Sequence, residues 1–412
     1  MTRRLRLVLL TVIIGLQLSL LTIGIGRDYR LKHEDNNALH ATFARSHVQL
    51  GLGTTRGQNY FHSPATASGE AYANHPPGPG LALAVVYSLT GRDGPVVTRA
   101  TAVAFHVLST VLFFGLACRI LGRGREALLA TSVFVLLPES AFFGRMMNHE
   151  VLGLPAAILL VRSCWESMQE RTDAPRWRAG CAVACIWGAL AGWAGFFVIA
   201  ACALYAAWEG LGRRNPRARG TLWLLLVLGA LLFTMDVAHL LWVADGGFGY
   251  LRELLTSRMS VAGDQGAAWT AGRLLEQHWR YFSLTGLVAV AALGYRGLRG
   301  LHAAAPSNPP VAVGLIFLIA GAGYVAAFSL NAARHDYWQF FLLPASAIGV
   351  TLAYRWLIEA AGRPSRRWAH LALLIVATVE FTLTAGFTLA QRHLNSEGYC
   401  IETVERLRRD AL

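Results

Sequence analysis

Long apolar segments recur along the chain, separated by short connections rich in arginine, and this pattern constrains the fold more than any other feature. The first segment, from Leu5 to Gly26, follows a basic start and is long enough to cross a bilayer, since about 20 apolar residues span the hydrocarbon core. No small-residue cleavage site follows it, which indicates an uncleaved anchor rather than a removed signal peptide. With 54% hydrophobic and 15% charged residues and a mean hydropathy of +0.42, the chain is too apolar for a soluble domain of 412 residues. The sequence therefore predicts a membrane protein.

The apolar segments predict an all-α, polytopic membrane protein with about eleven transmembrane helices and a single domain, residues 1–412. The predicted spans are approximately 5–26, 97–118, 126–143, 150–164, 179–192, 194–210, 221–243, 281–295, 310–330, 339–360 and 368–390. The two spans within 179–210 are very short, and we place the break between them near Gly192 to Gly195.

The distribution of arginine predicts the orientation of the helices. Short loops with several arginines alternate with short loops that have one or none, and the positive-inside rule places the former, with the N-terminus, in the cytoplasm. This alternation requires residues 78–91 to lie along the outer surface as an interfacial helix, because a segment this short that opens with Gly and Pro does not cross a bilayer. Loops 27–96 and 244–280, both with juxtamembrane helices, then face the outside of a cell membrane of the bacterial inner or plasma type.

The net charge of +13 does not indicate a nucleic-acid partner, because nearly all of the basic residues are arginines in short loops between apolar runs. The cysteines show neither a disulfide framework nor metal-ligand spacing. His33, His40 and His47 recur at a heptad interval, which would suggest a metal site, but such histidines more often form a polar helix face. We therefore predict no cofactor, and no motif supports a divalent cation.

Polar and charged side chains gather where the predicted outer loops meet the membrane. They lie in HEDNN with Glu34 and Asp35, in NHPPGPG with His75, in GRMMNHE with Arg145, His149 and Glu150, and in NAARHDYWQ with Arg334, His335 and Tyr337. An acid at this boundary is partly desolvated, which raises its pKa and suits it to act as a base near neutral pH. Arginine makes forked contacts with phosphate oxygens, so Arg145 and Arg334, with His335, are candidates for holding an anionic head group.

The order of these segments resembles the GT-C superfamily of integral-membrane glycosyltransferases, specifically the branch with protein O-mannosyltransferases and lipid A aminoarabinose transferases. The resemblance rests on HEDNNALHATFARSHVQLGLG after the first span, NHPPGPGLALAVVYSLTG, PESAFFGRMMNHE and the late RHDYWQFFLLP. It covers the first 165 residues in order and spacing, and the remainder mainly as a helix count.

The resemblance implies that a sugar arrives on a polyprenyl-phosphate carrier and that an acid of the first loop activates the acceptor. By motif this acid falls on Asp35, but family members often have Asp before Glu where this chain has Glu before Asp, so Glu34 stays an alternative base. The second acid falls on Glu150, where Asp is frequent in the relatives. The HPP element matches at His75, whereas Gly78 stands where an apolar residue is usual.

We therefore predict a polyprenyl-phosphate-sugar-dependent glycosyltransferase with its active site on the outer face. Its catalytic residues would be Asp35, Glu34 and Glu150, and its substrate-binding residues His75, Arg145, His149, Arg334, His335 and Tyr337. The acceptor would be a lipid, a protein or a cell-wall glycan. Asp236 and His239, near the outer end of the seventh span, are either part of the same cavity or a structural pair.

Two other functions fit the same composition. A secondary transporter would use outward acids and arginines along a substrate path, but it predicts inverted repeats and helices broken at the midplane, which the sequence does not show. A polyprenyl-lipid-binding or flipping protein without catalysis would bind the same donor and would tolerate the loss of Asp35.

Overall fold

A computed structural model describes residues 2–29, 34–63, 68–122, 124–169, 173–244, 247–259, 266–302 and 308–360, together with positions 379, 382, 383 and 386. His33 lies outside the described residues, as does the predicted span 368–390 apart from those four positions. The helices up to the middle of the chain are α1 (Arg3–Thr22), α2 (Asp35–Thr55), α3 (Gly78–Thr90), α4 (Pro95–Leu121), α5 (Gly124–Leu136), α6 (Pro138–Phe143), α7 (His149–Ser167), α8 (Ala174–Ala191) and α9 (Ala194–Ala207). The later helices are the π-helical turn η1 (Trp208–Gly212), α10 (Pro216–Val243), α11 (Gly247–Met259), α12 (Gly266–His302), α13 (Pro309–Ala327), α14 (Ser329–Arg334), the 3-10 helix η2 (Asp336–Leu342) and α15 (Leu343–Ala360).

Polar side chains cap the N-termini of helices at the start of an apolar run. The Oδ1 atom of Asn215 accepts hydrogen bonds from the backbone N–H groups at the start of α10, and Asp173 does the same for α8. Proline follows each of these caps within the first turn, where the missing N–H costs no hydrogen bond. Gly122 ends α4 with a φ of 70°, a conformation that side chains disfavour.

Among the described residues, six helical segments are long and apolar enough to cross a membrane. They are Arg3–Thr22, Pro95–Leu121, Ala194–Gly212, Pro216–Val243, Pro309–Ala327 and Asp336–Ala360. The predicted spans 150–164, 179–192 and 281–295 are also largely helical, but they fall short in length or in apolar composition. The predicted span 126–143 is divided into α5 and α6 by a break at Leu137, directly before Pro138. The predicted all-α, polytopic membrane class is thus confirmed, and the count of eleven spans stays a prediction.

The predicted break between two short spans is confirmed, because α8 ends at Ala191 and α9 begins at Ala194. The two helices meet closely at Gly188 and Gly195, where a Cβ on Gly195 would collide with the carbonyl group of Gly188. The predicted short helix at 78–91 is also a separate element, α3.

The predicted loop 27–96 contains two strands that the sequence did not predict, β1 (Tyr60–Ser63) and β2 (Ser68–Ala71), which pair antiparallel. Phe61 on β1 packs edge to face against Phe43 on α2, with ring centroids 4.9 Å apart. The predicted loop 244–280 also differs from expectation, because its last part and the predicted span 281–295 form one element, α12. Only Ser283, with a φ of 60°, interrupts it.

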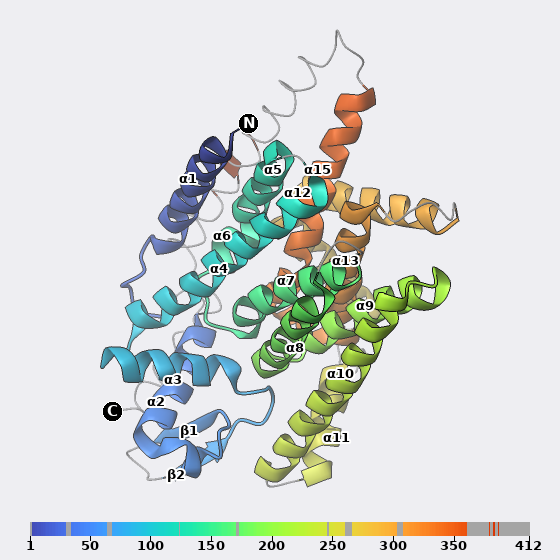
Figure 1. Ribbon diagram of the computed structural model, residues 1–412. Coiled ribbons are helices and arrows are strands. Elements are labelled where there is room, and N and C mark those ends of the chain that lie inside the picture. The colour runs from blue at the N-terminus through green and yellow to red at the C-terminus, as the bar shows by residue number, and fades with distance from the viewer. Residues whose placement is uncertain are drawn as a thin grey trace.

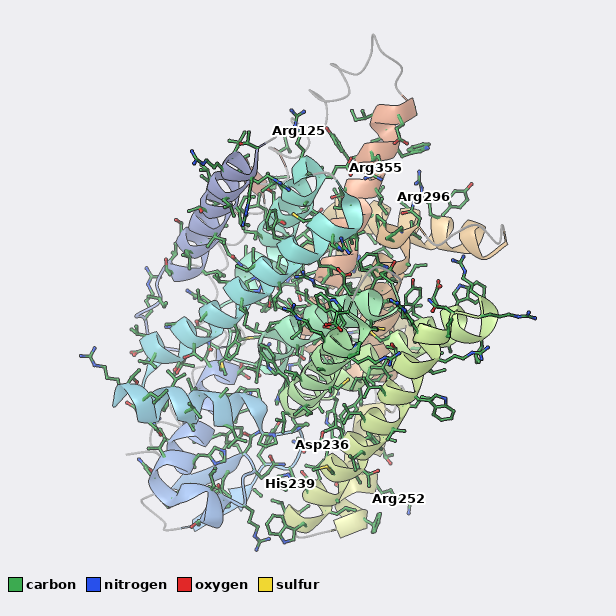
Figure 2. All side chains as sticks on the ribbon, in the orientation of Figure 1. Arg125, Asp236, His239, Arg252, Arg296 and Arg355 are labelled. Atoms are coloured by element: carbon green, nitrogen blue, oxygen red, sulfur yellow. The ribbon has the colours of Figure 1, made fainter. Side chains whose placement is uncertain are left out.

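The loop elements α2, β1, β2, α3 and α11 gather at the end of the bundle opposite the N-terminus (Figure 1). Figure 2 places Arg125, Arg296 and Arg355 toward the other end, and His239 and Arg252 at the end with the loop elements. This separation agrees with the predicted alternation of arginine-rich and arginine-poor loops. Helix α7 lies at the centre and packs against α4, α8 and α9.

Candidate active site

A partly open cavity of about 490 Å³ lies among the loop elements at this end of the bundle. Its lining residues are Asp35, Asn36, Leu39, His40, Tyr72, Asn74, His75, Asn148, His149, Glu150, Tyr250, Glu253, Asn331, Arg334, His335, Tyr337 and Trp338. The cavity therefore brings together seven of the nine predicted site residues, namely Asp35, His75, His149, Glu150, Arg334, His335 and Tyr337. The other two, Glu34 and Arg145, lie outside its lining.

Two hydrogen bonds join the walls of the cavity across long stretches of sequence. In the first turn of α2, the Oδ1 atom of Asn37 accepts a hydrogen bond of 2.7 Å from the backbone N–H of Met147, just before α7. The adjacent Asn36 accepts a hydrogen bond of 3.3 Å from the hydroxyl group of Tyr337 in η2. These contacts place Asp35 and Glu150 on one cavity, although they come from the first loop and from α7.

Glu34 has a different environment from its neighbour. Its Oε1 atom lies 2.9 Å from the Nη2 atom of Arg99 and 3.2 Å from the Nη2 atom of Arg145, and all three side chains are buried. The two guanidinium groups also donate to backbone carbonyl groups in the segment after α1, those of Ile23 and Ile25 among them. Glu34 and Arg145 thus belong to a buried ionic cluster outside the cavity lining, and their predicted roles as alternative base and as donor contact stay predictions.

The first turn of α7 supplies three neighbouring lining residues. The side chain of Asn148 caps the helix, its Oδ1 atom accepting a hydrogen bond of 2.8 Å from the N–H of Val151. The Oε1 atom of Glu150 accepts a hydrogen bond of 3.2 Å from the hydroxyl group of Tyr324. The ring of Tyr324 stacks on Trp338 with centroids 4.7 Å apart and planes 3° from parallel, and this packing holds the hydroxyl group that contacts Glu150 in position.

Three histidine rings pack against one another at the side of the cavity. His149 stacks on His75 with ring centroids 4.3 Å apart and meets His40 edge to face at 5.1 Å. The Nδ1 atom of His149 lies 2.7 Å from the carbonyl oxygen of Ala191, so Nδ1 carries the proton. Burial, with the nearby His149, lowers the pKa of His40 well below its ordinary value of 6.5. No group of three or more His, Cys, Asp or Glu side chains that could hold a metal ion is found in the described parts of the chain.

Several lining residues were missed by the sequence analysis. Four asparagines, Asn36, Asn74, Asn148 and Asn331, stand within the same motifs as the predicted residues, and this proximity was a usable signal. Tyr250 and Glu253 were not identifiable from a motif, because they come from the amphipathic helix α11. Tyr250 donates a hydrogen bond of 2.8 Å to Asn74 Oδ1, which ties α11 to the loop before α3.

Asp236 and His239 do not line the cavity. The Nε2 atom of His239 lies 2.9 Å from the carbonyl oxygen of Arg56, which joins the C-terminal end of α10 to the first loop. Figure 2 shows both side chains on α10 at the side facing the first loop. His239 therefore contacts the first loop, and no hydrogen bond between Asp236 and His239 is found among the described residues, so their structural pair stays a prediction.

Comparisons with known proteins agree with this architecture. The family model described as dolichyl-phosphate-mannose-protein mannosyltransferase matches residues 74–242, less than half of the chain. The fold is similar to that of ArnT from Cupriavidus metallidurans bound to undecaprenyl phosphate, with 15% identity and a TM-score of 0.59, covering 97% of this chain and 77% of ArnT. A comparison with curated proteins by sequence gives no match.

The fold is also similar to that of the archaeal oligosaccharyltransferase AglB from Archaeoglobus fulgidus in complex with an inhibitory peptide and a dolichol-phosphate. The identity is 13% and the TM-score 0.63, and the likeness covers 93% of this chain but 56% of AglB, so the chain spans about half of that protein. These likenesses confirm the predicted resemblance to the GT-C superfamily as a likeness of fold.

Proposed function

We propose that this chain, which has the GT-C fold of integral-membrane glycosyltransferases, transfers a sugar from a polyprenyl-phosphate donor to an acceptor at the outer face of the membrane. The observation that carries the proposal is the single cavity lined by both Asp35 and Glu150. ArnT and AglB, whose folds are similar, were solved with polyprenyl phosphates of the kind proposed here as the donor's carrier.

Asp35 is the base in this proposal. Inverting displacement at the anomeric carbon requires that the acceptor hydroxyl lose its proton as its oxygen bonds to that carbon. Asp35 lines the cavity at the start of α2 and is half-buried, whereas Glu34 is engaged by two arginines. The proton passes to the carboxylate of Asp35, and the bond between the anomeric carbon and the phosphate oxygen breaks with its electron pair on the phosphate.

Arg334 and His335 are proposed to stabilise the departing phosphate. Both line the cavity at the end of α14, and Arg334 is exposed there. A polyprenyl phosphate leaves with negative charge close to hydrocarbon, so a cation at this position lowers the free energy of the transition state. Arg145, expected to share this task, is instead paired with Glu34.

Transfer by the purified protein tests the proposal. The protein in lipid vesicles is incubated with a radiolabelled polyprenyl-phosphate sugar and a membrane extract that contains acceptors. We expect labelled product with the wild type, and with Asp35→Asn a rate lower by about 100-fold or more, the usual contribution of general base catalysis. Full transfer by Asp35→Asn would remove its role as base.

The same vesicles separate the two other functions. A transporter would accumulate a labelled solute without forming a glycosylated product. A lipid-binding or flipping protein would move the donor between leaflets equally well with Asp35→Asn. Labelling of single introduced cysteines at positions 35 and 150 from each side tests the proposed outer placement of the cavity, since both must react from the same side.

A further inference from the structure

Two buried polar atoms at the start of α7 belong to residues that line the cavity. Asn148 Nδ2 and Glu150 Oε2 have no hydrogen-bond partner among the residues that the structure describes. Both residues line the cavity, and their exposed fractions are only 1% for Asn148 and 2% for Glu150. Buried polar groups in folded proteins are nearly always hydrogen-bonded, so a donor and an acceptor left open on two residues that line one cavity indicate a ligand that pairs with both.

The orientation of the Asn148 amide is set by the helix cap. Its Oδ1 atom accepts the hydrogen bond from Val151 N–H, and an NH2 group in that position has no lone pair to accept it. The amide therefore cannot flip, and Nδ2 is the atom left to donate to a ligand. The carboxyl group of Glu150 is held in a similar way, because the hydroxyl group of Tyr324 occupies its other oxygen, Oε1.

We propose that Asn148 and Glu150 bind two neighbouring hydroxyl groups of the transferred sugar, an inference that rests on the proposed glycosyltransferase function. A hydroxyl group both donates and accepts, so Asn148 N–H pairs with the oxygen of one hydroxyl and the Glu150 carboxyl accepts the proton of the next. Both residues line the same cavity, at the N-cap and in the first turn of α7, so one sugar ring in the cavity can contact both.

The charge of Glu150 favours binding of the sugar, rather than of the phosphate, beside Asn148 and Glu150. A helix N-terminus normally attracts anions, but the carboxyl group of Glu150 in the first turn of α7 opposes a second negative group. The phosphate therefore lies toward Arg334 and His335, on the segment after α13. An ammonium group would suit Glu150 but not Asn148, since two donors do not pair. The subsite is thus built for an uncharged ring with adjacent hydroxyls.

An aromatic surface completes the subsite. Trp338 lines the cavity and is held by its stacking on Tyr324, the same residue that donates to Glu150. A rigid indole surface beside two hydroxyl-binding groups suits the apolar C–H face of a sugar ring. This arrangement assigns to Asn148 a role in sugar selection that is separate from the chemistry at Asp35.

The experiment measures binding of citronellyl phosphate and of its mannose, glucose, galactose and arabinose esters to the detergent-solubilised full chain. We expect wild type to bind at least one ester about tenfold more tightly than citronellyl phosphate. Asn148→Ser retains a capping oxygen but lacks the NH2 group, and Glu150→Gln retains the shape of the side chain. Each variant should lose roughly tenfold in affinity for the preferred ester, with unchanged affinity for citronellyl phosphate.

Asn215→Ser is the matched control, because the Oδ1 atom of Asn215 also caps a helix, α10, and the residue lies outside the cavity lining. It should leave the preference among the esters unchanged. The inference is overturned if Asn148→Ser discriminates between ester and citronellyl phosphate as wild type does, or if wild type binds citronellyl phosphate but none of the esters more tightly. Failure of wild type to bind any of these lipids and to transfer sugar would instead overturn the proposed function, and this inference with it.

Discussion

The carboxyl group of Glu34 is ion-paired with Arg99 at 2.9 Å, and the Arg99 side chain is fully buried in α4. Glu34 stands directly before α2, whose first residue is Asp35. The pair therefore attaches the start of α2 to the bundle at the point where the proposed base enters the cavity. Two adjacent acids of similar chemistry thus have different surroundings, because Glu34 is paired with buried arginines and Asp35 lines the cavity.

Glu34→Gln should destabilise the protein strongly. The substitution leaves two buried guanidinium groups, those of Arg99 and Arg145, without their carboxylate, and breaking a buried pair in this way costs about 3–5 kcal/mol. The free energy of unfolding in detergent, measured by denaturant titration, checks this value. Asp93→Asn is the control, because its pair with Arg45 is partly exposed and should contribute about 1 kcal/mol or less. Wild-type stability of Glu34→Gln together with loss of transfer would instead favour Glu34 as the base.

His47 should make the fold sensitive to acid. Burial lowers the pKa of His47 from 6.5 to about 4, so the unfolded chain binds the proton more readily than the folded protein between these values. The contribution of neutral His47 to the free energy of unfolding is complete above about pH 6.5 and is lost as the pH falls toward 4. The unfolding midpoint is measured from pH 4 to 7.5 for wild type and for His47→Asn. The midpoint of the variant should depend less on pH than that of wild type. Equal slopes would contradict this assignment.

Removal of divalent cations should leave sugar transfer intact. The rings of His75 and His149 lie face to face 4.3 Å apart, and the Nδ1 atom of His149 already contacts the Ala191 carbonyl oxygen, so their nitrogen lone pairs do not converge on one point. The transfer rate is measured before and after treatment with EDTA. It is measured again after Mg²⁺, Mn²⁺ or Zn²⁺ is added to the treated protein. Loss of activity that one of these ions restores would show that a metal takes part.

Gly78→Ala should displace α3 from α8. A Cβ at this position would collide with the backbone carbonyl oxygen of Leu190 and would lie 3.0 Å from Ala191 Cα, so neither neighbour can move aside as a side chain would. This contact explains why glycine follows the HPP element in this chain. We expect a lower melting temperature and weaker transfer, because His75 is carried by the same loop. Gly53→Ala is the control, since a Cβ on Gly53 would have no neighbouring atom within 4 Å, and it should behave as wild type.

The apolar pattern was sufficient to predict the helical membrane class and the main boundaries. The break between α8 and α9 and the separate helix α3 were both foreseen, because a bilayer sets the length of a span and glycine and proline interrupt it locally. The hairpin of β1 and β2 was not foreseen, since its pairing depends on packing with Phe43 and Tyr72 rather than on a strong alternation of its own.

Hydrophobic spacing was enough to predict that acids, histidines and arginines lie near the ends of helices, because the length of an apolar run shows where a helix ends. Which of these side chains contact one another depends on how the helices pack. Arg99, far from Glu34 in sequence, pairs with that acid in a cluster with Arg145, outside the cavity lining. The hydrogen bond between Asn37 and Met147 joins the segments that carry Asp35 and Glu150. Such contacts depend on how several helices pack around α7, and hydrophobic periodicity contains no information about side-chain partners across the bundle.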